Sequence, residues 1–356
     1  MLRRAREFAA VMRRLPRRVA QAEQAIAETR AMLRRLSSLE EALHGLDARI
    51  AESVALDRQR VEALEEQVGE KGPYLSLGAA IHELGRRTDD SLGHALGRLE
   101  ALEAEAAEVR RHLQVREVMD WIERASLRSS PLISVIVPTR DRSTLLRRAL
   151  DSVIGQSYPN WEAVVTDDGS LDDTPAVLKG VADPRVRPLR GEGRGTCAAR
   201  NLALARASGE LIAYLDDDNL MHPQWLKAVA WAFEQRPEAD VLYGAFVVDD
   251  IERIGGERRG AMPRLFFHPY DHKRVAEQNI ADMGCIAHRA RLPEACFDED
   301  LREMGDWDLF LRLTREKPPL ALPAIACFYT TDAPNRTTNG PTHLQDMATV
   351  KRKNRR

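Results

Sequence analysis

The chain has 356 residues, of which 44% are hydrophobic and 30% charged, a composition typical of a protein that buries a substantial core. The formal net charge is −2, so no global field favours nucleic acid as a partner. Four cysteines without a CxxC pair predict reduced thiols rather than a disulfide framework or a zinc site. No apolar run reaches the roughly 20 residues of a membrane span, and we therefore expect a soluble, cytoplasmic protein.

Residues 1–20 are rich in arginine. Phe8, Met12 and Leu15 can share one face of a helix there, while seven arginines occupy the rest. Such a basic amphipathic helix can lie on anionic lipid, which would place the protein peripherally at the inner face of the membrane. A solvated helix end, with arginines for solubility, explains the same pattern, and we favour this second interpretation.

Residues 1–125 carry the pattern of long helices. From Leu36 to Val68 apolar residues recur every three or four positions, and Gly69, Gly72 and Pro73 then predict a break. A second helical segment starts near Ser76 and resumes the heptad spacing. We predict an all-α, coiled-coil-like region, which can be an intramolecular hairpin or a homo-oligomer; the pattern does not choose between them.

After Pro131 the pattern changes to alternating strands and helices. Short β-branched apolar runs predict strands buried on both faces, and amphipathic stretches predict the helices between them. This alternation predicts an α/β domain with a mainly parallel sheet. The predicted strands are 132–137, 163–166, 186–189, 211–215 and 320–329, and the predicted helices start at Ser143, at Asp172 or Asp173, and at Thr196.

Three polar clusters follow predicted strands: PTRDR at 138–142, DDGS at 167–170 and DDDN at 216–219. In parallel sheets ligands bind beyond the carboxyl ends of the strands, so we expect these clusters to form one site. Asp216 and Asp218 flank Asp217 and can hold one divalent cation, for which oxygen ligands suit Mg²⁺ or Mn²⁺. An acidic helix cap explains one aspartate there but hardly three.

Two further segments are candidate parts of this site. Carboxylates of DDGS can accept N–H groups of a nucleobase or ribose hydroxyls, although a capped turn explains that cluster equally well. A glycine-rich loop at 191–196 opens a helix that carries Arg200, and both features suit phosphate oxygens. Arg200 can instead pair with the acidic turns.

Asp306 precedes the buried run Leu309–Leu313 and is expected in the first turn of a helix. The helix dipole would lower its pKa there. A carboxylate that faces an acceptor can take the proton from an attacking hydroxyl. A simple helix cap is the alternative, and for this residue alone it would be preferred.

Taken together, these segments resemble glycosyltransferase family 2, whose GT-A-fold members transfer a sugar from a nucleotide-sugar. The resemblance covers about residues 131–330 and leaves residues 1–125 outside. It predicts two domains, a helical region over 1–125 and a GT-A domain over 131–356. The matching stretches are SVIVPTRDR (134–142), SVIGQSYPNWE (152–162), VVTDDGSLDDT (164–174), GTCAARNLAL (195–204), ELIAYLDDDN (210–219) and GDWDLFLR (305–312).

The resemblance implies a role for each matching position. Nucleotide binding would fall to Pro138, Thr139, Arg140, Asp167, Asp168, Arg200 and Asp217, with Asp168 and Asp167 reading the base, most often uracil. Asp216 and Asp218 would form the DxD site for Mn²⁺ or Mg²⁺. Asp306 would be the catalytic base of an inverting, single-displacement transfer.

The chain departs from the family pattern at Gly305, where the family more often has Glu, and this puts in doubt any acceptor contact of that Glu. Gly284 fits a strand on the acceptor side. His343 is the candidate third metal ligand, although an exposed tail histidine is the simpler interpretation. Tyr329, Thr330 and Arg336 are candidates for a closing acceptor loop.

The function predicted from the sequence is transfer of a sugar from a UDP-sugar to a hydroxyl of a saccharide, a lipid-linked molecule or a protein, in polysaccharide or glycoconjugate synthesis. A nucleotidyltransferase would need a glycine-rich basic signature after the first strand, and PTRDR has no glycine. A non-catalytic nucleotide-binding module, tethered by an oligomerising helical region, is the remaining alternative.

Overall fold

The computed structural model describes residues 74–249, 264–330 and 342–354, together with residues 31, 33–42, 44–45, 48–49, 51–52, 55–56 and 58–60; side chains are not described for 74–92, 94–96 and 249. The chain divides into two compact units, Met1–Leu113 and Gln114–Arg356. The predictions for residues 1–20, for the break at 69–73 and for Arg336 lie outside the described residues. None of the described helices combines the length and apolar character needed to cross a membrane.

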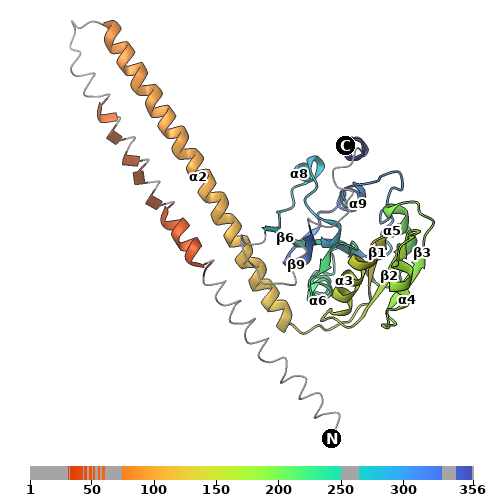
Figure 1. Cartoon of the computed structure of the whole chain (residues 1–356). Helices are drawn as coiled ribbons and strands as arrows, with labels where there is room; N and C mark the ends of the chain where they lie inside the picture. Colours follow the sequence, from red (N-terminus) through yellow and green to blue (C-terminus); the bar gives the residue numbers. More distant parts are fainter. Residues whose placement is uncertain are drawn as a thin grey trace. The chain divides into compact units, whose positions relative to one another are not determined.

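In the first unit, helical residues 33–42 pack against the long helix α2, Tyr74–Arg124 (Figure 1). Leu39, Ala106 and Val109 form the buried centre of this contact. Two ion pairs flank it, Arg110–Glu40 at 3.1 Å and Arg35–Glu105. The described part of the helical region is therefore packed intramolecularly, as in a hairpin, and a homo-oligomer through this region stays a prediction.

The second unit is built around a mixed sheet, which has nine strands among the described residues in the order β3-β2-β1-β4-β8-β6-β9-β5, with β7 beside β6. The first four strands are parallel, β8 is antiparallel to β4 and β6, and β6 runs parallel to β9. The predicted α/β fold with a mainly parallel sheet is confirmed, and the antiparallel pairs all involve β5, β7 or β8. The strands are β1 Ile133–Thr139, β2 Trp161–Asp167, β3 Val186–Arg190, β4 Leu211–Tyr214, β5 Leu220–Met221, β6 Val241–Asp249, β7 Arg264–Phe266, β8 Ile286–Arg289 and β9 Leu320–Thr330.

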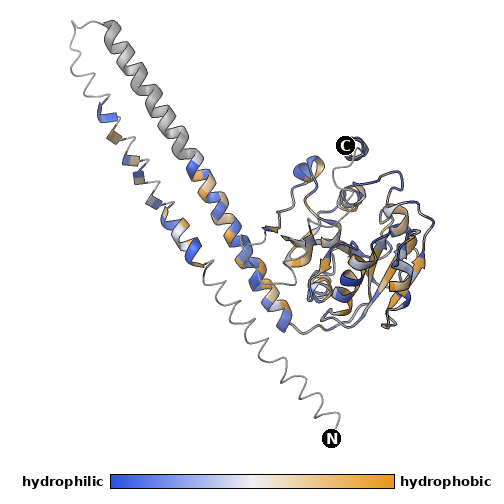
Figure 2. Cartoon of the chain, viewed as in Figure 1, coloured by the Kyte–Doolittle hydropathy of each residue, from blue (hydrophilic) through white to orange (hydrophobic). Residues whose placement is uncertain are grey.

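Helices cover both faces of this sheet because successive strand residues point to opposite sides. On β1, Val135 and Val137 belong to one hydrophobic cluster with α3, α4, α6 and the end of α2, whereas Ile136 belongs to the opposite cluster with α5, α8, α9 and α10. Figure 2 shows the hydrophobic residues concentrated on the strands and the adjoining helix faces. The helices are α3 Ser143–Ile154, α4 Thr174–Lys179, α5 Thr196–Leu204, α6 Trp225–Gln235, α8 His272–Glu277, α9 Gly305–Leu313 and α10 His343–Lys353.

Gly284 lies elsewhere than predicted. It is part of the 3₁₀ turn η1, Met283–Cys285, directly before β8 rather than on the strand itself. The Asp282 side chain caps this turn, because its Oδ1 accepts the Gly284 N–H at 2.9 Å. The turn places Asp282 at the end of the sheet where the candidate site lies.

Candidate active site

The three polar clusters predicted to meet do line one cavity of about 820 Å³, a size typical of small-molecule sites. It lies at the carboxyl ends of β1, β2 and β4, and α5 and α9 add residues from one face of the sheet. The predicted site residues that line it are Pro138, Thr139, Arg140, Asp168, Arg200, Asp216, Asp217, Asp218 and Asp306.

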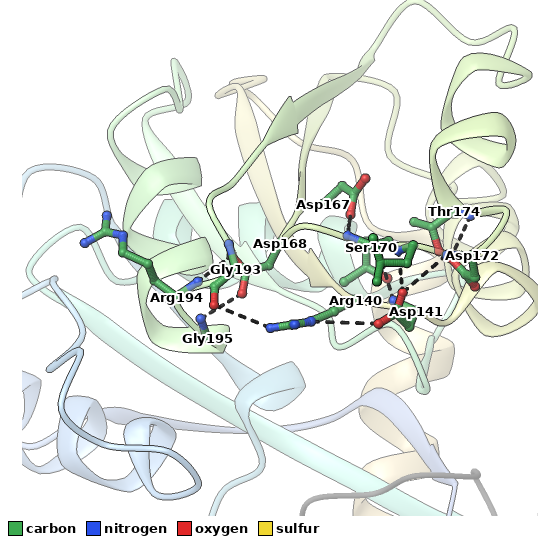
Figure 3. A network of polar contacts seen from close by, with 12 residues as sticks. Arg140, Asp141, Asp167, Asp168, Ser170, Asp172, Thr174, Gly193, Arg194 and Gly195 are labelled. Atoms are coloured by element: carbon green, nitrogen blue, oxygen red, sulfur yellow. Dashed lines mark hydrogen bonds and ion pairs between the residues drawn. The ribbon is translucent and has the colours of Figure 1, made fainter.

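Asp168 is held by the glycine-rich loop. Its Oδ1 accepts the N–H groups of Gly193 at 2.9 Å and Arg194 at 3.2 Å, and its Oδ2 accepts that of Gly195 at 2.7 Å (Figure 3). Gly193 has a φ of 75°, and a Cβ at Gly191 would meet Asp168 Oδ1 at 2.9 Å, so the loop needs glycine to wrap around this carboxylate. The sequence suggested that this loop binds phosphate oxygens. In the structure its N–H groups bind Asp168 instead.

Asp167 points away from the cavity. The register of β2 and β3 pairs it with Arg190, and the Arg190 guanidinium donates to its Oδ2. Its Oδ1 accepts the Ser170 N–H at 2.9 Å. Asp167 thus shapes the DDGS turn, together with Asp141, whose Oδ1 accepts the Leu171 N–H at 2.6 Å (Figure 3). A role for Asp167 in base recognition stays a prediction that its orientation does not support.

The middle aspartate of the DDD sequence is the most enclosed. Asp217 is 5% exposed, and its two oxygens accept from Thr139 Oγ1 at 2.7 Å and Arg142 Nη1 at 2.9 Å. Burial raises the pKa of Asp217 to about 6 in spite of the Arg142 charge. Thr139 and Asp217 therefore contact each other, and together they connect the ends of β1 and β4.

Asp216 and Asp218 each have an arginine partner. Arg200 Nη2 lies 2.5 Å from Asp216 Oδ1, and Arg142 Nη1 lies 3.0 Å from Asp218 Oδ2. Arg200 is 7% exposed, and its guanidinium lies 5.1 Å from the centre of the Phe297 ring. The structure shows the pairing with an acidic turn that was the alternative interpretation of Arg200, and Arg200 also lines the cavity. Its role in nucleotide binding stays a prediction.

Asp282 is a site residue that the sequence interpretation missed. It lines the cavity, and burial, then the negative charges of Asp216 and Asp306, raise its pKa to about 8. Arg142 and Arg200 thus leave an excess of negative charge here. Carboxylate oxygens in such a field fit a hard divalent cation such as Mg²⁺ or Mn²⁺. The sequence signal was weak, a single Asp before the apolar run at Cys285–Ala287.

Asp306 lies in the first turn of α9, as predicted. Its Oδ1 accepts the Trp307 N–H at 2.7 Å, and its Oδ2 accepts from Asn279 Nδ2 at 2.9 Å. Trp307 anchors the helix by donating its indole N–H to the Val275 carbonyl at 2.7 Å. The predicted pKa direction was wrong: burial outweighs Arg200 and these hydrogen bonds, and the pKa of Asp306 is raised. A raised pKa makes the carboxylate a better proton acceptor.

The packing around Gly305 explains sterically why this chain has glycine where the family more often has Glu. Gly305 is buried at the start of α9, and a Cβ placed on it would lie 2.6 Å from Cys197 Sγ and 3.4 Å from Phe297 Cδ1. A glutamate side chain has no room at this position while Cys197 occupies α5. The helix that carries Asp306 therefore approaches α5 more closely than a larger residue would allow.

The remaining candidates are divided between the cavity and the core. His343 lines the cavity, and its Nδ1 lies 3.2 Å from Glu303 Oε2. Tyr329 also lines the cavity, whereas Thr330 is buried and donates its hydroxyl to the Asp218 carbonyl at 2.6 Å. Thr330 thus fixes the DDDN turn against β9. His343 as a third metal ligand stays a prediction.

Comparison with known proteins agrees with this geometry. A family model described as glycosyl transferase family 2 matches residues 134–292. WcaA of Escherichia coli K12, a protein named as a colanic acid biosynthesis glycosyl transferase, is 31% identical over 193 residues, which cover 53% of this chain and 68% of WcaA. The chain belongs to glycosyltransferase family 2. This confirms the resemblance and identifies the protein as a glycosyltransferase.

Two further similar proteins match different shares of this glycosyltransferase. WfgD of Escherichia coli, named as a UDP-Glc:alpha-D-GlcNAc-diphosphoundecaprenol beta-1,3-glucosyltransferase, is 39% identical over 90 residues, which cover 25% of this chain and 36% of WfgD. The S. aureus TarS 1-349 structure in complex with UDP-GlcNAc superposes with a TM-score of 0.51 at 20% identity, over 61% of this chain and 64% of that one. The TarS likeness shows that the fold is shared.

Proposed function

We propose that this glycosyltransferase moves a sugar from a UDP-sugar to a hydroxyl acceptor with inversion at the anomeric carbon, in the synthesis of a polysaccharide or glycoconjugate. The observation that carries the proposal is the arrangement of Asp216, Asp218 and Asp306 around one cavity, at the ends of elements that the sequence keeps far apart. The alternative of a nucleotide-binding module without activity does not explain why a half-buried carboxylate with a raised pKa faces this cavity.

The donor side of the cavity would be formed by the ends of β1, β2 and β4. Thr139, Arg140 and Asp168 line it, and Asp168 is already held in place by three backbone N–H groups. A carboxylate offers about four acceptor positions, so Asp168 can accept one further N–H from a base. The choice of UDP is supported by the donor in the WfgD name and by the UDP-GlcNAc in the TarS complex.

Asp216 and Asp218 would hold the divalent cation. Bound Mn²⁺ or Mg²⁺ would neutralise the diphosphate as negative charge develops on it. Asp217 is excluded from that role by its orientation, because Thr139 and Arg142 bind both of its oxygens. We assign Asp217 to holding the acidic turn against β1, where it keeps its two neighbours facing the cavity.

Asp306 would take the proton of the acceptor hydroxyl. In the proposed step the acceptor oxygen attacks the anomeric carbon, its proton passes to Asp306, and the anomeric C–O bond to the β-phosphate breaks so that UDP leaves. Asn279 orients the carboxylate from one side and the Trp307 N–H from the other. Transfer in this geometry gives a product with inverted anomeric configuration.

The test compares Asp218→Asn, Asp306→Asn and the control Asp300→Asn, which changes an exposed aspartate of the same unit. UDP binding is measured by calorimetry with Mn²⁺ and with EDTA, and transfer by UDP release. We expect Asp218→Asn to remove the Mn²⁺-dependent part of UDP binding. Asp306→Asn should keep UDP binding and lose about 10²- to 10⁴-fold in transfer, the usual contribution of a general base.

Two results would contradict the proposal. Equal affinity for UDP in Mn²⁺ and in EDTA would remove the cation from the donor site. Transfer by Asp306→Asn at the rate of Asp300→Asn would remove Asp306 as the base. NMR of the product, with its anomeric coupling constant, tests inversion separately from both.

A further inference from the structure

Two buried cysteines and Asp282 lie together beside the candidate active site. Cys285 ends the turn η1 and Cys327 lies on β9, 42 residues further along the chain, with their Sγ atoms 3.9 Å apart. Cys327 Sγ also lies 3.9 Å from Asp282 Oδ1. One ligand atom of each residue lies within 4.8 Å of those of the other two. We call these three residues the thiol–carboxylate cluster. The proposed function gives it no role.

The spacing of the cluster fits three ligands of one tetrahedral metal ion. Zn–S bonds of about 2.3 Å place two sulfurs about 3.8 Å apart, and a Zn–O bond of about 2.0–2.2 Å places an oxygen about 3.5–3.6 Å from a sulfur. The observed separations, 3.9 Å for both pairs, differ from these values by about 0.1–0.4 Å. Small side-chain rotations therefore suffice for the three residues to bind one ion.

The carboxylate distinguishes this arrangement from ordinary core packing. Buried cysteines pack as small apolar groups, and the distance between these two sulfurs is also an ordinary contact. Cys285 and Cys327 are indeed fully buried in the hydrophobic cluster that contains Val135 and Val137. Apolar packing does not explain the half-buried carboxylate of Asp282 beside them, because moving a carboxylate out of water costs free energy. A cation bound by all three residues removes this cost.

Gly284 holds the carboxylate close to the thiols. Its N–H donates to Asp282 Oδ1 at 2.9 Å, which fixes the side chain within η1. A Cβ at Gly284 would lie 3.0 Å from Cys327 Sγ and 3.2 Å from Asp282 Oδ1, so a larger residue would push oxygen and sulfur apart. The glycine thus lets η1 approach β9 closely, and its N–H orients a ligand as groups around metal sites commonly do.

The cluster differs in chemistry from the acidic turn. The oxygen ligands of Asp216 and Asp218 suit Mg²⁺ or Mn²⁺, whereas two thiolates select a softer ion such as Zn²⁺. Asp282 lines the cavity and the two cysteines do not, so an ion from the cavity reaches the sulfurs past this carboxylate. Three protein ligands leave the fourth position of a tetrahedral ion for water.

We propose that Asp282, Cys285 and Cys327 form a binding site for a thiophilic divalent cation such as Zn²⁺, separate from the acidic turn. Binding forms two metal–sulfur bonds and one metal–oxygen bond, and the protons held by these ligands pass to the solvent. The inference does not rest on the proposed function, since neither UDP nor a sugar takes part. The sequence hides the site, because its two cysteines lie far apart and form no CxxC pair.

The test titrates Cd²⁺ and Co²⁺ into the full chain, after reduction with a phosphine and removal of metals with a chelator that is then dialysed away. Bound Cd²⁺ reports thiolate ligands by ultraviolet charge-transfer absorption, and Co²⁺ reports tetrahedral geometry by its visible bands. Competition between Zn²⁺ and Co²⁺ gives the zinc affinity. The cluster variants are Cys285→Ser, Cys327→Ser and Asp282→Asn. The control is the double variant Cys197→Ala/Cys296→Ser, which keeps only the two cysteines of the cluster.

We expect one Cd²⁺ per chain with the absorption of two thiolate ligands, and the same signal from the control. Each cysteine variant should lose the two-thiolate signal and bind Zn²⁺ about 10²-fold more weakly, the share of one ligand in a structural zinc site. Asp282→Asn should keep both thiolates and bind Zn²⁺ at least about 10-fold more weakly. Excess Mn²⁺ should leave the Cd²⁺ signal in place, because Mn²⁺ prefers oxygen ligands.

The unaltered protein and the control decide the question even where a cysteine variant fails to fold. No Cd²⁺ signal from the reduced protein, or loss of the signal in the control, would overturn the inference. So would a full signal in Cys285→Ser or Cys327→Ser, or displacement of Cd²⁺ by Mn²⁺ at equal concentration.

A disulfide is the other chemistry open to the two thiols, and it needs the sulfurs to approach to about 2.05 Å. A Cys285–Cys327 disulfide formed on mild oxidation, together with no metal binding by the reduced protein, would assign the pair to redox chemistry and overturn the metal site. Loss of Mn²⁺-dependent UDP binding would contradict the proposed function and leave this site unaffected. The two failures are therefore distinguishable.

Discussion

Gly305→Ala tests whether the close approach of α9 to α5 positions Asp306. The added Cβ would lie 2.6 Å from Cys197 Sγ, well inside van der Waals contact, and Cys197 is only 3% exposed. Overpacking of this kind costs about 1–3 kcal/mol. The gain from replacing a helical glycine by alanine is about 0.5–1 kcal/mol, so with the central values of both ranges we expect a net loss of about 1 kcal/mol in the free energy of unfolding.

A double-mutant cycle isolates this contact. Cys197→Ala removes the sulfur and should cost about 1 kcal/mol by itself, as small truncations in a core do. In the double variant the new methyl group occupies the space of the sulfur, so the two changes should couple favourably by about 1 kcal/mol or more. Gly305→Glu, which introduces the residue more common in the family, should cost more, because it also buries a charge.

Urea unfolding followed by tryptophan fluorescence measures these free energies of unfolding in the unit Gln114–Arg356. Its five tryptophans lie within Gln114–Arg356, at positions 121, 161, 225, 231 and 307. We further expect Gly305→Ala to reduce transfer more than UDP affinity, because the displaced residue adjoins Asp306. The reasoning is refuted if Gly305→Ala unfolds at the urea concentration of the unaltered protein, or if the two changes are additive.

Three other residues give separate predictions. His288 is fully buried, and burial lowers its pKa from 6.5 to about 4. Between these two pH values the imidazole is protonated in the unfolded chain but not in the folded protein, so the free energy of unfolding is highest above pH 6.5 and falls as the pH falls towards 4. As the pH falls from 6.5 to 4, the free energy of unfolding should decrease by about 3 kcal/mol less in His288→Gln than in His272→Gln, the control at an exposed histidine. Equal pH slopes of the two variants in urea unfolding would contradict this. Asp168→Asn should lower the thermal midpoint and weaken UDP binding together, since its charge anchors the glycine-rich loop; unchanged UDP affinity would remove it from the donor site. Asn279→Leu should raise the pKa of Asp306 further by removing a hydrogen bond to the ionised form, which moves the acid limb of the pH–rate profile upward, and a fixed limb would count against Asp306 as the base.

The sequence predicted the outline of the site because parallel strands end at a common edge. Thr139, Asp168 and Asp216 each follow a buried apolar run, and that pattern places them together without further knowledge. The position of Asp306 in the first turn of a helix was likewise predicted from the apolar run that follows it. These predictions needed only local patterns and one rule of sheet topology.

What the sequence did not predict depends on packing between distant segments. Asp167 faces away from the cavity because β2 and β3 align it with Arg190, and register is not visible in either strand alone. Asp282 was missed because the charges that define its environment, on Asp216 and Asp306, are far from it in the chain. The pKa of Asp306 was predicted in the wrong direction because the helix dipole is local, whereas burial depends on the elements packed around α9.

The position of β8 in the sheet has a consequence for how such an enzyme diversifies. β8 lies between β4, which leads into the acidic turn, and β6, which carries Phe246. One strand therefore separates the acidic turn, which the proposed function assigns to the donor, from the part of the cavity lined by β6. Under the proposed function, a substitution on β6 would change the cavity beside that strand and leave the acidic turn at the end of β4 in place, so donor and acceptor preference could be altered separately.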